Sequence, residues 1–265
     1  MGRTRDAVSA YPLGSGDVAV VTGGASGIGL RAVERFAQRG AKVAVVDLNP
    51  GAAQAALAAA GSTVYQCDVS DREALDAVFA DISSTLGPPK VVFANAGIHA
   101  GAADPFTLDG DAIETMLNVN VKGVVWTIGA ARPHTPPGGH IVVTASLSGA
   151  GPYTIDPLYS ATKHAVVGFV RSLAPLLQSE GIVLSAIAPG IVDTPLVGED
   201  VVELLKSVNF DLLSTDDVID ALDVALTEAQ PGACYISLPG MEPVPYRFRG
   251  LPGARVPLDD SSAPL

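Results

Sequence analysis

Short runs of β-branched residues alternate with longer stretches rich in alanine and leucine along most of this chain. Successive parallel strands need a long crossover connection, usually a helix, and helices on both faces make parallel strands continuously apolar. The strand-like runs are residues 18–22, 42–47, 63–66, 91–94, 140–145, 183–188 and 234–237. The helical stretches between them are residues 28–39, 51–60, 71–86, 109–131, 157–179 and 214–228. This alternation predicts an α/β fold, with a doubly wound sheet and helices on both faces.

The chain divides into one long core region and two flanking segments. No linker rich in proline, glycine, serine or charge interrupts residues 17–238, so residues 1–265 are expected to form a single domain. Residues 1–16 are expected to be an N-terminal arm. The tail, residues 239–265, is too rich in proline for a regular element. It is either a loose terminus or a segment that crosses to a neighbouring subunit and walls its pocket.

Composition excludes several classes of protein. The net charge of -12 would repel phosphates, which argues against a nucleic-acid partner. Cys67 and Cys234 are far apart, and neither has the close partner of a metal or redox motif, so we expect buried free thiols and no metal site. The first apolar run, residues 17–22, is too short for a signal peptide or a membrane span. We therefore expect a cytoplasmic protein without membrane contact.

Two of the expected helices are unusually apolar. The stretch 158–177 is apolar around most of its circumference, and one sheet face cannot cover such a helix. Pro175 should kink it or end it, because proline lacks the amide proton for the i to i-4 bond. The stretch 109–131 has a similar character. Either both are core helices, or they pair with copies of themselves in a homotetramer or homodimer, which we favour.

A glycine-rich turn follows the first expected strand and leads directly into a helix. A strand, such a turn and a helix N-terminus together form an anion site, because free amide protons and the helix dipole face a phosphate that glycine lets approach. A glycine cluster alone could be only a tight turn. The flanking strand and helix therefore predict a nucleotide site. Its residues are Gly23, Ser26, Gly27, Ile28 and Gly29.

The second expected strand ends in Asp47. A carboxylate at this position can accept hydrogen bonds from both hydroxyls of an adenosine ribose, and it would repel a 2′-phosphate. No compensating cation stands at Ser26 in the turn or at Leu48 after the acid. The sequence therefore predicts NAD in preference to NADP.

Two further motifs stand at strand ends. Asp68-Val69 follows the third strand, and Asp68 either bonds the adenine edge or caps the helix expected to begin near Ser70. Asn95-Ala96-Gly97 follows the fourth strand. It would bring backbone close to the adenosine ribose and support the crevice of the sheet.

Tyr159 and Lys163 stand four residues apart and share one face of an expected helix. An ammonium beside the phenol would favour its ionised form and lower a pKa that is ordinarily about 10. The hydroxyl of Ser146, thirteen residues upstream, could hold the same substrate oxygen by hydrogen bonding. The spacing alone usually means aromatic packing beside a lysine stem, so the pair gains meaning only with the other motifs.

In combination, these motifs match a known family. They are Thr22-Gly23-x-x-x-Gly27-x-Gly29, Asp68-Val69, Asn95-Ala96-Gly97, Asn120, Ser146, Tyr159-x-x-x-Lys163 and Pro189-Gly190. In order and spacing the set resembles the short-chain dehydrogenase/reductase family, from about residue 17 to residue 238. Each motif is weak or moderate alone, whereas their ordered occurrence is highly specific. Ala94 and Ala145 depart from the usual Asn-Asn-Ala-Gly and Ser-Ser patterns without removing a catalytic group.

The resemblance implies a Rossmann-like sheet of seven parallel strands in a dimer or tetramer. It also implies that Tyr159 is the catalytic acid/base, that Lys163 holds the nicotinamide ribose, and that Ser146 polarises the substrate oxygen. Asn120 would hold a water that links Lys163 to solvent. The rival of Asn120 is Asn118, although the residues that follow Asn120 fit the family pattern better.

Further roles follow from the same resemblance. Ser148 competes with Ser146, but only Ser146 stands three residues before a glycine and thirteen before the tyrosine. After Pro189-Gly190, the Val192 backbone and the Thr194 hydroxyl would clamp the nicotinamide carboxamide.

The expected substrate pocket is mostly apolar. Its wall residues include His99, Leu147, Tyr153 and Leu196, and residues 194–210 read as a mobile flap. His99 could contact substrate, or it could be a solvated loop residue. A hydrophobic or aromatic alcohol fits such walls better than a sugar does. Aryl ketones, steroids, prostaglandin-like lipids and small alicyclic alcohols all remain open.

We therefore hypothesise an NAD-dependent oxidoreductase that interconverts a secondary alcohol and a ketone, with oxidation as the preferred direction. An NAD(H)-binding redox sensor without turnover would not require the full catalytic set. An acyl-carrier-protein ketoreductase would favour NADP and a basic docking face, which the charge of -12 opposes. An epimerase or dehydratase of the related extended family would need a large C-terminal substrate domain, which the proline-rich tail is too short to supply.

Overall fold

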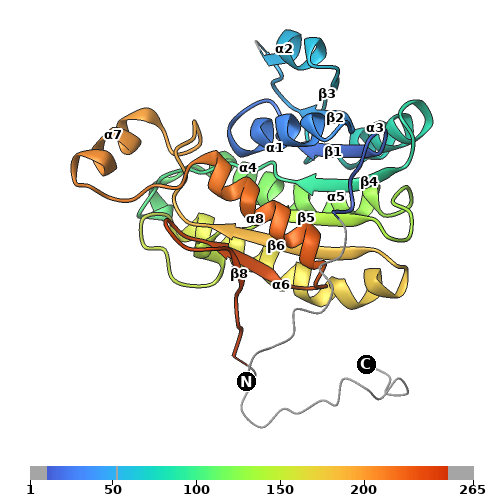
Figure 1. Cartoon of the computed structure of the whole chain (residues 1–265). Coiled ribbons are helices and arrows are strands. Elements are labelled where there is room, and N and C mark those ends of the chain that lie inside the picture. The colour runs from blue at the N-terminus through green and yellow to red at the C-terminus, as the bar shows by residue number, and fades with distance from the viewer. Residues whose placement is uncertain (1–10, 52, 250–265) are drawn as a thin grey trace.

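The structure is a computed structural model that describes residues 11–51 and 53–249. Its centre is an eight-stranded sheet in the order β3-β2-β1-β4-β5-β6-β7-β8 (Figure 1). The strands are β1 (Val18–Thr22), β2 (Lys42–Asp47), β3 (Thr63–Gln66), β4 (Pro89–Ala94), β5 (His140–Thr144), β6 (Val183–Pro189), β7 (Cys234–Ser237) and β8 (Val244–Pro245). The order reverses between β1 and β4, and in such sheets a ligand crevice opens at the strand ends beside this point.

Helices cover both faces of the sheet (Figure 1). They are α1 (Gly27–Gln38), α2 (Ala53–Ala59), α3 (Arg72–Thr85), α4 (Gly110–Leu117), α5 (Gly123–Ala131), α6 (Pro157–Ser179), α7 (Glu199–Ser207) and α8 (Thr215–Glu228). Apolar side chains of α1 and α8 pack in one core cluster, and those of α3, α5 and α6 pack in another. Alternate residues of the central strands belong to one cluster or the other, because successive side chains of a strand point to opposite faces of the sheet.

The α/β fold and its doubly wound sheet are confirmed, and the predicted strands all form. The seven parallel strands expected from the resemblance are all present, and the sheet has one strand more, because β8 pairs antiparallel with β7 at its edge. The expectation that the proline-rich tail has no regular element is wrong, because residues 244–245 form β8. Pro245 is tolerated because an edge strand leaves one side of its backbone unpaired, where a missing amide proton costs nothing.

Two helical stretches differ from their predicted form. The single helix expected at 109–131 contains the π-helical turn Asn118–Lys122 between α4 and α5. Within the segment expected to be a flap, Glu199–Ser207 forms α7. Acidic residues in its first turn and Lys206 in its last complement the helix dipole.

The outcomes differ for the proline in α6, the two cysteines and the chain ends. Helix α6 continues to Ser179, so Pro175 does not end it. Cys67 and Cys234 are buried free thiols, as predicted, and burial raises the pKa of each. The arm at 1–10 and the tail beyond residue 249 lie outside the described residues. Among the described helices, none has both the length and the apolar character needed to cross a bilayer.

Candidate active site

The turn between β1 and α1 is built from glycines whose hydrogens face neighbouring backbone. Gly23 has φ of +63°, and a Cβ there would lie 2.9 Å from the Cα of Ala96. At Gly29 a Cβ would lie 2.0 Å from the carbonyl oxygen of Gly23. Gly27, with φ of +52°, faces Thr194 in the loop after β6. The predicted glycine-rich turn therefore packs closely against two other strand ends, where only glycine fits.

The N-terminus of α1 is open to an anion. Its N-cap, Ser26, is extended and exposed, and its side chain makes no capping hydrogen bond. By contrast, Asp71, Asp156 and Ser214 cap their helices through side-chain oxygens. The first amides of a helix have no intrahelical partner, and the helix dipole favours negative charge beside them. This turn therefore fits the pyrophosphate of a dinucleotide, with Ile28 in the first turn of the helix.

Asp47 ends β2 beside this turn. Its Oδ2 accepts from the amide of Ala25 at 3.0 Å, and its Oδ1 accepts from the amide of Asn49 at 2.9 Å. These bonds fix the carboxylate at the rim of the glycine-rich turn and leave further lone pairs on each oxygen. Leu48, the next residue, is half exposed and carries no charge.

Asp68 and Val69 follow β3. Asp68 is half-buried, and its Oδ1 accepts from the amide of Ser70 at 2.8 Å. The N-cap of α3 is Asp71, so the alternative in which Asp68 caps this helix is wrong. Val69 is buried against Gly123, where a Cβ would lie 2.7 Å from a Val69 methyl group. Val69 therefore sets how closely α5 approaches the end of β3, and its contact with adenine stays a prediction.

Asn95 joins the ends of three strands. Its amide and that of Ala96 both donate to the Thr22 hydroxyl, at 3.0 and 3.2 Å. The side-chain amide donates to the carbonyls of Thr22 and Gly23, and its oxygen accepts from Thr144 at 3.0 Å. The Asn95 side chain is thus used within the protein, where it ties together the ends of β1, β4 and β5, and the contact of Asn95-Ala96-Gly97 with a ribose stays a prediction.

Tyr159, Lys163 and Ser146 converge at the carboxyl end of β5. Lys163 Nζ lies 5.5 Å from the centre of the Tyr159 ring and donates to the Thr144 carbonyl at 2.8 Å. Ser146 stands two residues after the end of β5 and is a hydrogen-bond partner of the Tyr159 phenol. Three residues predicted to act together therefore lie together, although they come from two separate elements.

The protonation of this cluster differs from expectation. Burial raises the pKa of Tyr159 to about 12, the Ser146 hydrogen bond lowers it less, and the charges of Tyr153 and Asp156 raise it further. Burial also lowers the pKa of Lys163 to about 8. The prediction that the tyrosine pKa falls is therefore wrong for the chain by itself. Desolvation penalises the phenolate more than the distant ammonium favours it.

Asn120 lies fully buried in the π-helical turn. Its side chain accepts from the amide of Ile98 at 2.8 Å and donates to the carbonyl of the same residue at 2.9 Å. A Cβ on Gly97 would lie 3.4 Å from Asn120 Oδ1 and 3.6 Å from Lys163 Nζ. Asn120 thus borders the same small region as Lys163. Turns of this kind are frequent at functional sites.

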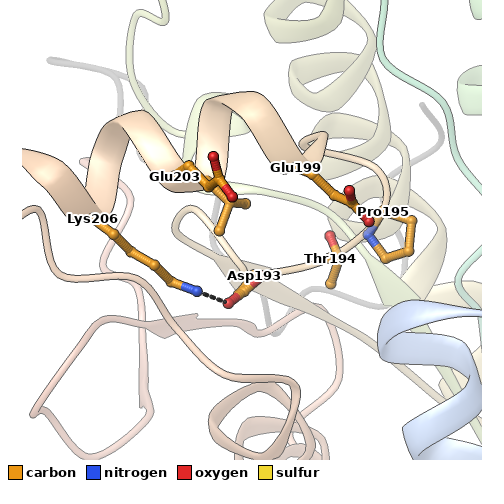
Figure 2. Close-up of a pocket in the computed structure, with 7 residues that line it drawn as sticks. Asp193, Thr194, Pro195, Glu199, Glu203 and Lys206 are labelled. Carbon is orange, nitrogen blue, oxygen red and sulfur yellow. Dashed lines mark hydrogen bonds and ion pairs between the residues drawn. The ribbon is translucent and has the colours of Figure 1, made fainter.

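The loop after β6 carries the other predicted nicotinamide contacts. The amide of Gly190, next to Pro189, donates to Ser237 at 3.0 Å, and Val192 forms a parallel bridge with Leu213. Thr194 approaches the glycine-rich turn at Gly27. Beyond it, a cavity of about 510 Å³ lies between this loop and α7, and an ion pair of Lys206 with Asp193 closes one side (Figure 2).

Of the residues predicted to line the substrate pocket, some contact Tyr159 and others do not. The His99 and Tyr153 rings stand edge-on to Tyr159, with ring centres 5.4 and 6.5 Å away. Leu147 lies beside Gly190, whose Cβ would be 3.5 Å from a Leu147 methyl group. Leu196 is 45% exposed on the loop before α7, and its place in the pocket stays a prediction.

Sequence reasoning missed two residues of the cluster. Thr162 donates to the Tyr159 carbonyl at 2.7 Å and accepts from Asn120 at 3.2 Å. Asp156 is fully buried and caps α6. The dipeptide Asp156-Pro157 is a helix-start signal that could have revealed the cap. Nothing in the sequence pattern indicates the other contacts of either residue.

Comparisons with known proteins agree with this geometry. The family described as "short chain dehydrogenase" matches residues 17–203. A (+)-borneol dehydrogenase 1 from Salvia officinalis is 35% identical, over 84% of this chain and 90% of its own length. A secoisolariciresinol dehydrogenase from Forsythia intermedia is 36% identical, over 66% of this chain and 65% of its own. A short-chain dehydrogenase from Burkholderia cenocepacia J2315, solved in complex with NADP, is 29% identical with a TM-score of 0.75, over 84% and 96% of the two chains.

The chain therefore belongs to the short-chain dehydrogenase/reductase family. Its class is that of the nicotinamide-dependent oxidoreductases that act on alcohols and ketones.

Proposed function

We propose that this chain is an NAD-dependent dehydrogenase that interconverts a secondary alcohol and a ketone on a hydrophobic or aromatic substrate. The observation that carries the proposal is the convergence of Ser146, Tyr159 and Lys163 at the carboxyl end of the sheet. The anion site at α1 lies along the same edge. A bound nicotinamide supplies the hydride acceptor or donor.

The protein side of the reaction is a proton transfer. Tyr159 removes the proton of an alcohol, or delivers one to a carbonyl oxygen, while the Ser146 hydroxyl holds the same oxygen. Lys163 Nζ lies 5.5 Å from the centre of the Tyr159 ring and close to Gly97, where it can hold the nicotinamide ribose. Asn120 borders Lys163 and would hold the water that leads protons to solvent. A phenol with a pKa of about 12 needs this ammonium and a bound cofactor to become a useful base near neutral pH.

The preference for NAD rests on Asp47. Two backbone amides fix its carboxylate beside the glycine-rich turn, where it can accept from ribose hydroxyls and would repel a 2′-phosphate. The neighbouring Leu48 adds no positive charge. The solved Burkholderia relative was crystallised with NADP, so the two cofactors must be measured side by side.

The walls of the site favour an apolar substrate. Tyr153 stands edge-on to Tyr159, Leu147 lies beside Gly190, and the amide of Ile98 donates to Asn120. The names of two relatives assign them (+)-borneol and secoisolariciresinol. We therefore propose that this chain takes a hydrophobic cyclic or aromatic alcohol, and that oxidation with NAD is its preferred direction.

The test is a panel of secondary alcohols that includes (+)-borneol and 1-phenylethanol, with absorbance of the reduced cofactor as the readout. Turnover should be at least tenfold more efficient with NAD than with NADP. Tyr159→Phe should lower kcat at least about a thousandfold, because the proton acceptor is gone, while fluorescence titration shows unchanged NADH affinity. Retained activity in this variant would rule out the role of Tyr159. Tight NADH binding without oxidation of any alcohol would instead indicate a redox sensor.

A further inference from the structure

Asp156 makes more contacts than a helix cap requires. Its Oδ1 accepts from the amide of Tyr159 at 2.9 Å, which is the capping bond of α6. Its Oδ2 accepts from the amides of Ala100 and Gly101, at 3.2 and 2.9 Å. These two amides belong to the loop that follows β4, so one carboxylate joins this loop to the first turn of the helix that carries Tyr159.

The other aspartate caps of the fold show what is unusual here. Asp71 and Asp109 each accept from one amide of their own helix, and both bonds are exposed. The side chain of Asp156 has no solvent exposure. Burying a carboxylate is costly unless several donors surround it. Three backbone amides and the N-terminus of α6 supply that compensation.

His99 completes the arrangement. Its Nε2 lies 3.6 Å from Asp156 Oδ2, and its ring stands edge-on to Tyr159 at 77° between the planes. His99 also lines a cavity of about 370 Å³ between this loop and α4, together with Ile98, Leu108 and Met116. Asp156 therefore contacts the backbone of the acid/base residue on one side and the polar wall of this cavity on the other.

We propose that Asp156 is a positioning residue, which fixes the Tyr159 phenol relative to His99, and that His99 so held is a specificity-determining wall of the substrate pocket. The proposal rests on the proposed function, because it assigns Tyr159 the proton transfer. Asp156 touches no reacting atom. It acts by holding α6 and the loop at residues 98–101 in one geometry, and small misplacements of a catalytic group lower rates strongly.

The variant that tests this is Asp156→Ser. A serine hydroxyl can still cap Tyr159, but it is too short to bind the amides of Ala100 and Gly101 as well. Asp71→Ser makes the same exchange at an N-cap on α3 and is the matched control. Asp156→Asn keeps the size of the side chain but replaces one carboxylate oxygen with an NH2 group, which can only donate. That NH2 group would either face the backbone donors of Ala100 and Gly101 or take the place of the oxygen that caps α6. Asp156→Asn serves as the second variant if the serine variant folds poorly.

Hydrogen exchange and steady-state kinetics are measured on the full chain. Hydrogen exchange should show faster exchange at residues 100–101 in Asp156→Ser and unchanged exchange there in Asp71→Ser. With the best alcohol of the panel, kcat should fall about tenfold or more in both Asp156 variants and less than twofold in Asp71→Ser. NADH affinity should stay within twofold throughout, because the nucleotide contacts lie elsewhere. His99→Ala should raise KM about fivefold with a bulky alcohol and have little effect with 2-propanol, which is too small to reach the wall.

Equal kcat in Asp156→Ser and Asp71→Ser would overturn the positioning role, and so would unchanged exchange at residues 100–101. A uniform KM change in His99→Ala across alcohol sizes would overturn the specificity role. The exchange experiment needs no turnover. If wild-type protein oxidises no alcohol, the proposed function fails while the link between Asp156 and the loop is still decided.

Discussion

Lys163 is needed by the proposed reaction, yet its buried charge lowers the stability of the fold. Its side chain is buried, with 3% of the residue exposed, and Nζ donates to the Thr144 carbonyl. Burial lowers its pKa from 10.5 to about 8. At about 1.4 kcal/mol for each pKa unit, keeping this ammonium charged in the fold costs about 3 kcal/mol. The site therefore holds a charge that the fold would be more stable without.

We predict that Lys163→Met raises the free energy of unfolding at pH 7 by about 1–2 kcal/mol, while it removes activity. The gain is smaller than the full penalty because the Thr144 carbonyl loses its donor. The sign of the pH dependence follows from proton binding. Between pH 8 and 10.5 the unfolded wild-type chain holds a proton that the folded chain has lost, so wild-type stability rises with pH there. The advantage of Lys163→Met should thus be greatest below pH 8 and shrink toward pH 10.

Urea denaturation of both proteins at pH 7 and pH 9.5 measures this difference. A variant that is less stable than wild type at both pH values would contradict the desolvation of Lys163. An advantage that grows with pH would contradict the sign of its pKa shift.

Residue patterns predicted which side chains meet but not how they titrate. The four-residue spacing placed Tyr159 and Lys163 on one helix face, as the structure has them. The pKa values of both depend on burial, and that of Tyr159 also depends on Ser146, Tyr153 and Asp156, which no local pattern reports. The two bonds that Asp156 Oδ2 accepts from the loop span 55 and 56 residues of sequence, so only the folded chain reveals them.

At the scale of elements, charged side chains bind α1 to α8. Asp223 on α8 accepts from Arg35 at 2.5 Å and from Arg39 at 3.3 Å on or beside α1, and from the Tyr11 hydroxyl at 2.7 Å. Its side chain is only 18% exposed. Asp220, one turn earlier, is 63% exposed and lies 3.4 Å from Arg35. The two aspartates are thus chemically alike and differ in burial.

We predict that Asp223→Asn lowers the free energy of unfolding by about 2 kcal/mol, because a partly buried carboxylate that serves three donors contributes more than an exposed pair. Asp220→Asn should cost less than about 0.5 kcal/mol, which is typical of exposed ion pairs. Chemical denaturation at matched ionic strength gives both values. Equal losses in the two variants would show that burial does not decide the strength of these contacts.

Elements with a strong periodic pattern were predicted almost to the residue, whereas short or irregular ones were not. β1, β2, β3 and β7 have their predicted bounds, because apolar runs between turn residues leave few alternatives. Helix α7 was missed because Gly198 at its N-cap and the two acidic residues of its first turn resemble a loop. The π-helical turn has no sequence signal of its own, and the hydrogen bonds that its Asn120 makes with the Ile98 backbone span 22 residues of sequence.

At the scale of the whole molecule, one face of α6 is left uncovered by the residues that the structure describes. Ala161, Ala165, Gly168 and Ser172 are exposed at helical spacing. A Cβ added to Gly168 or to Gly129 of α5 would meet nothing within 4 Å. Small side chains allow helices of two subunits to approach closely. The homotetramer or homodimer expected from the sequence therefore stays a prediction, with this face as the expected contact.

We predict that Ala165→Arg lowers the oligomeric state, because the face would then bury a charged side chain against its own copy. Ala58→Arg adds the same side chain to an exposed alanine of α2 and is the matched control. Light scattering after size exclusion should give the oligomer mass for wild type and Ala58→Arg, and a smaller mass for Ala165→Arg. Circular dichroism should show that both variants keep their helices. An unchanged mass in Ala165→Arg would place any subunit contact on another surface. A wild-type monomer would contradict the expectation that α6 is covered by a second subunit.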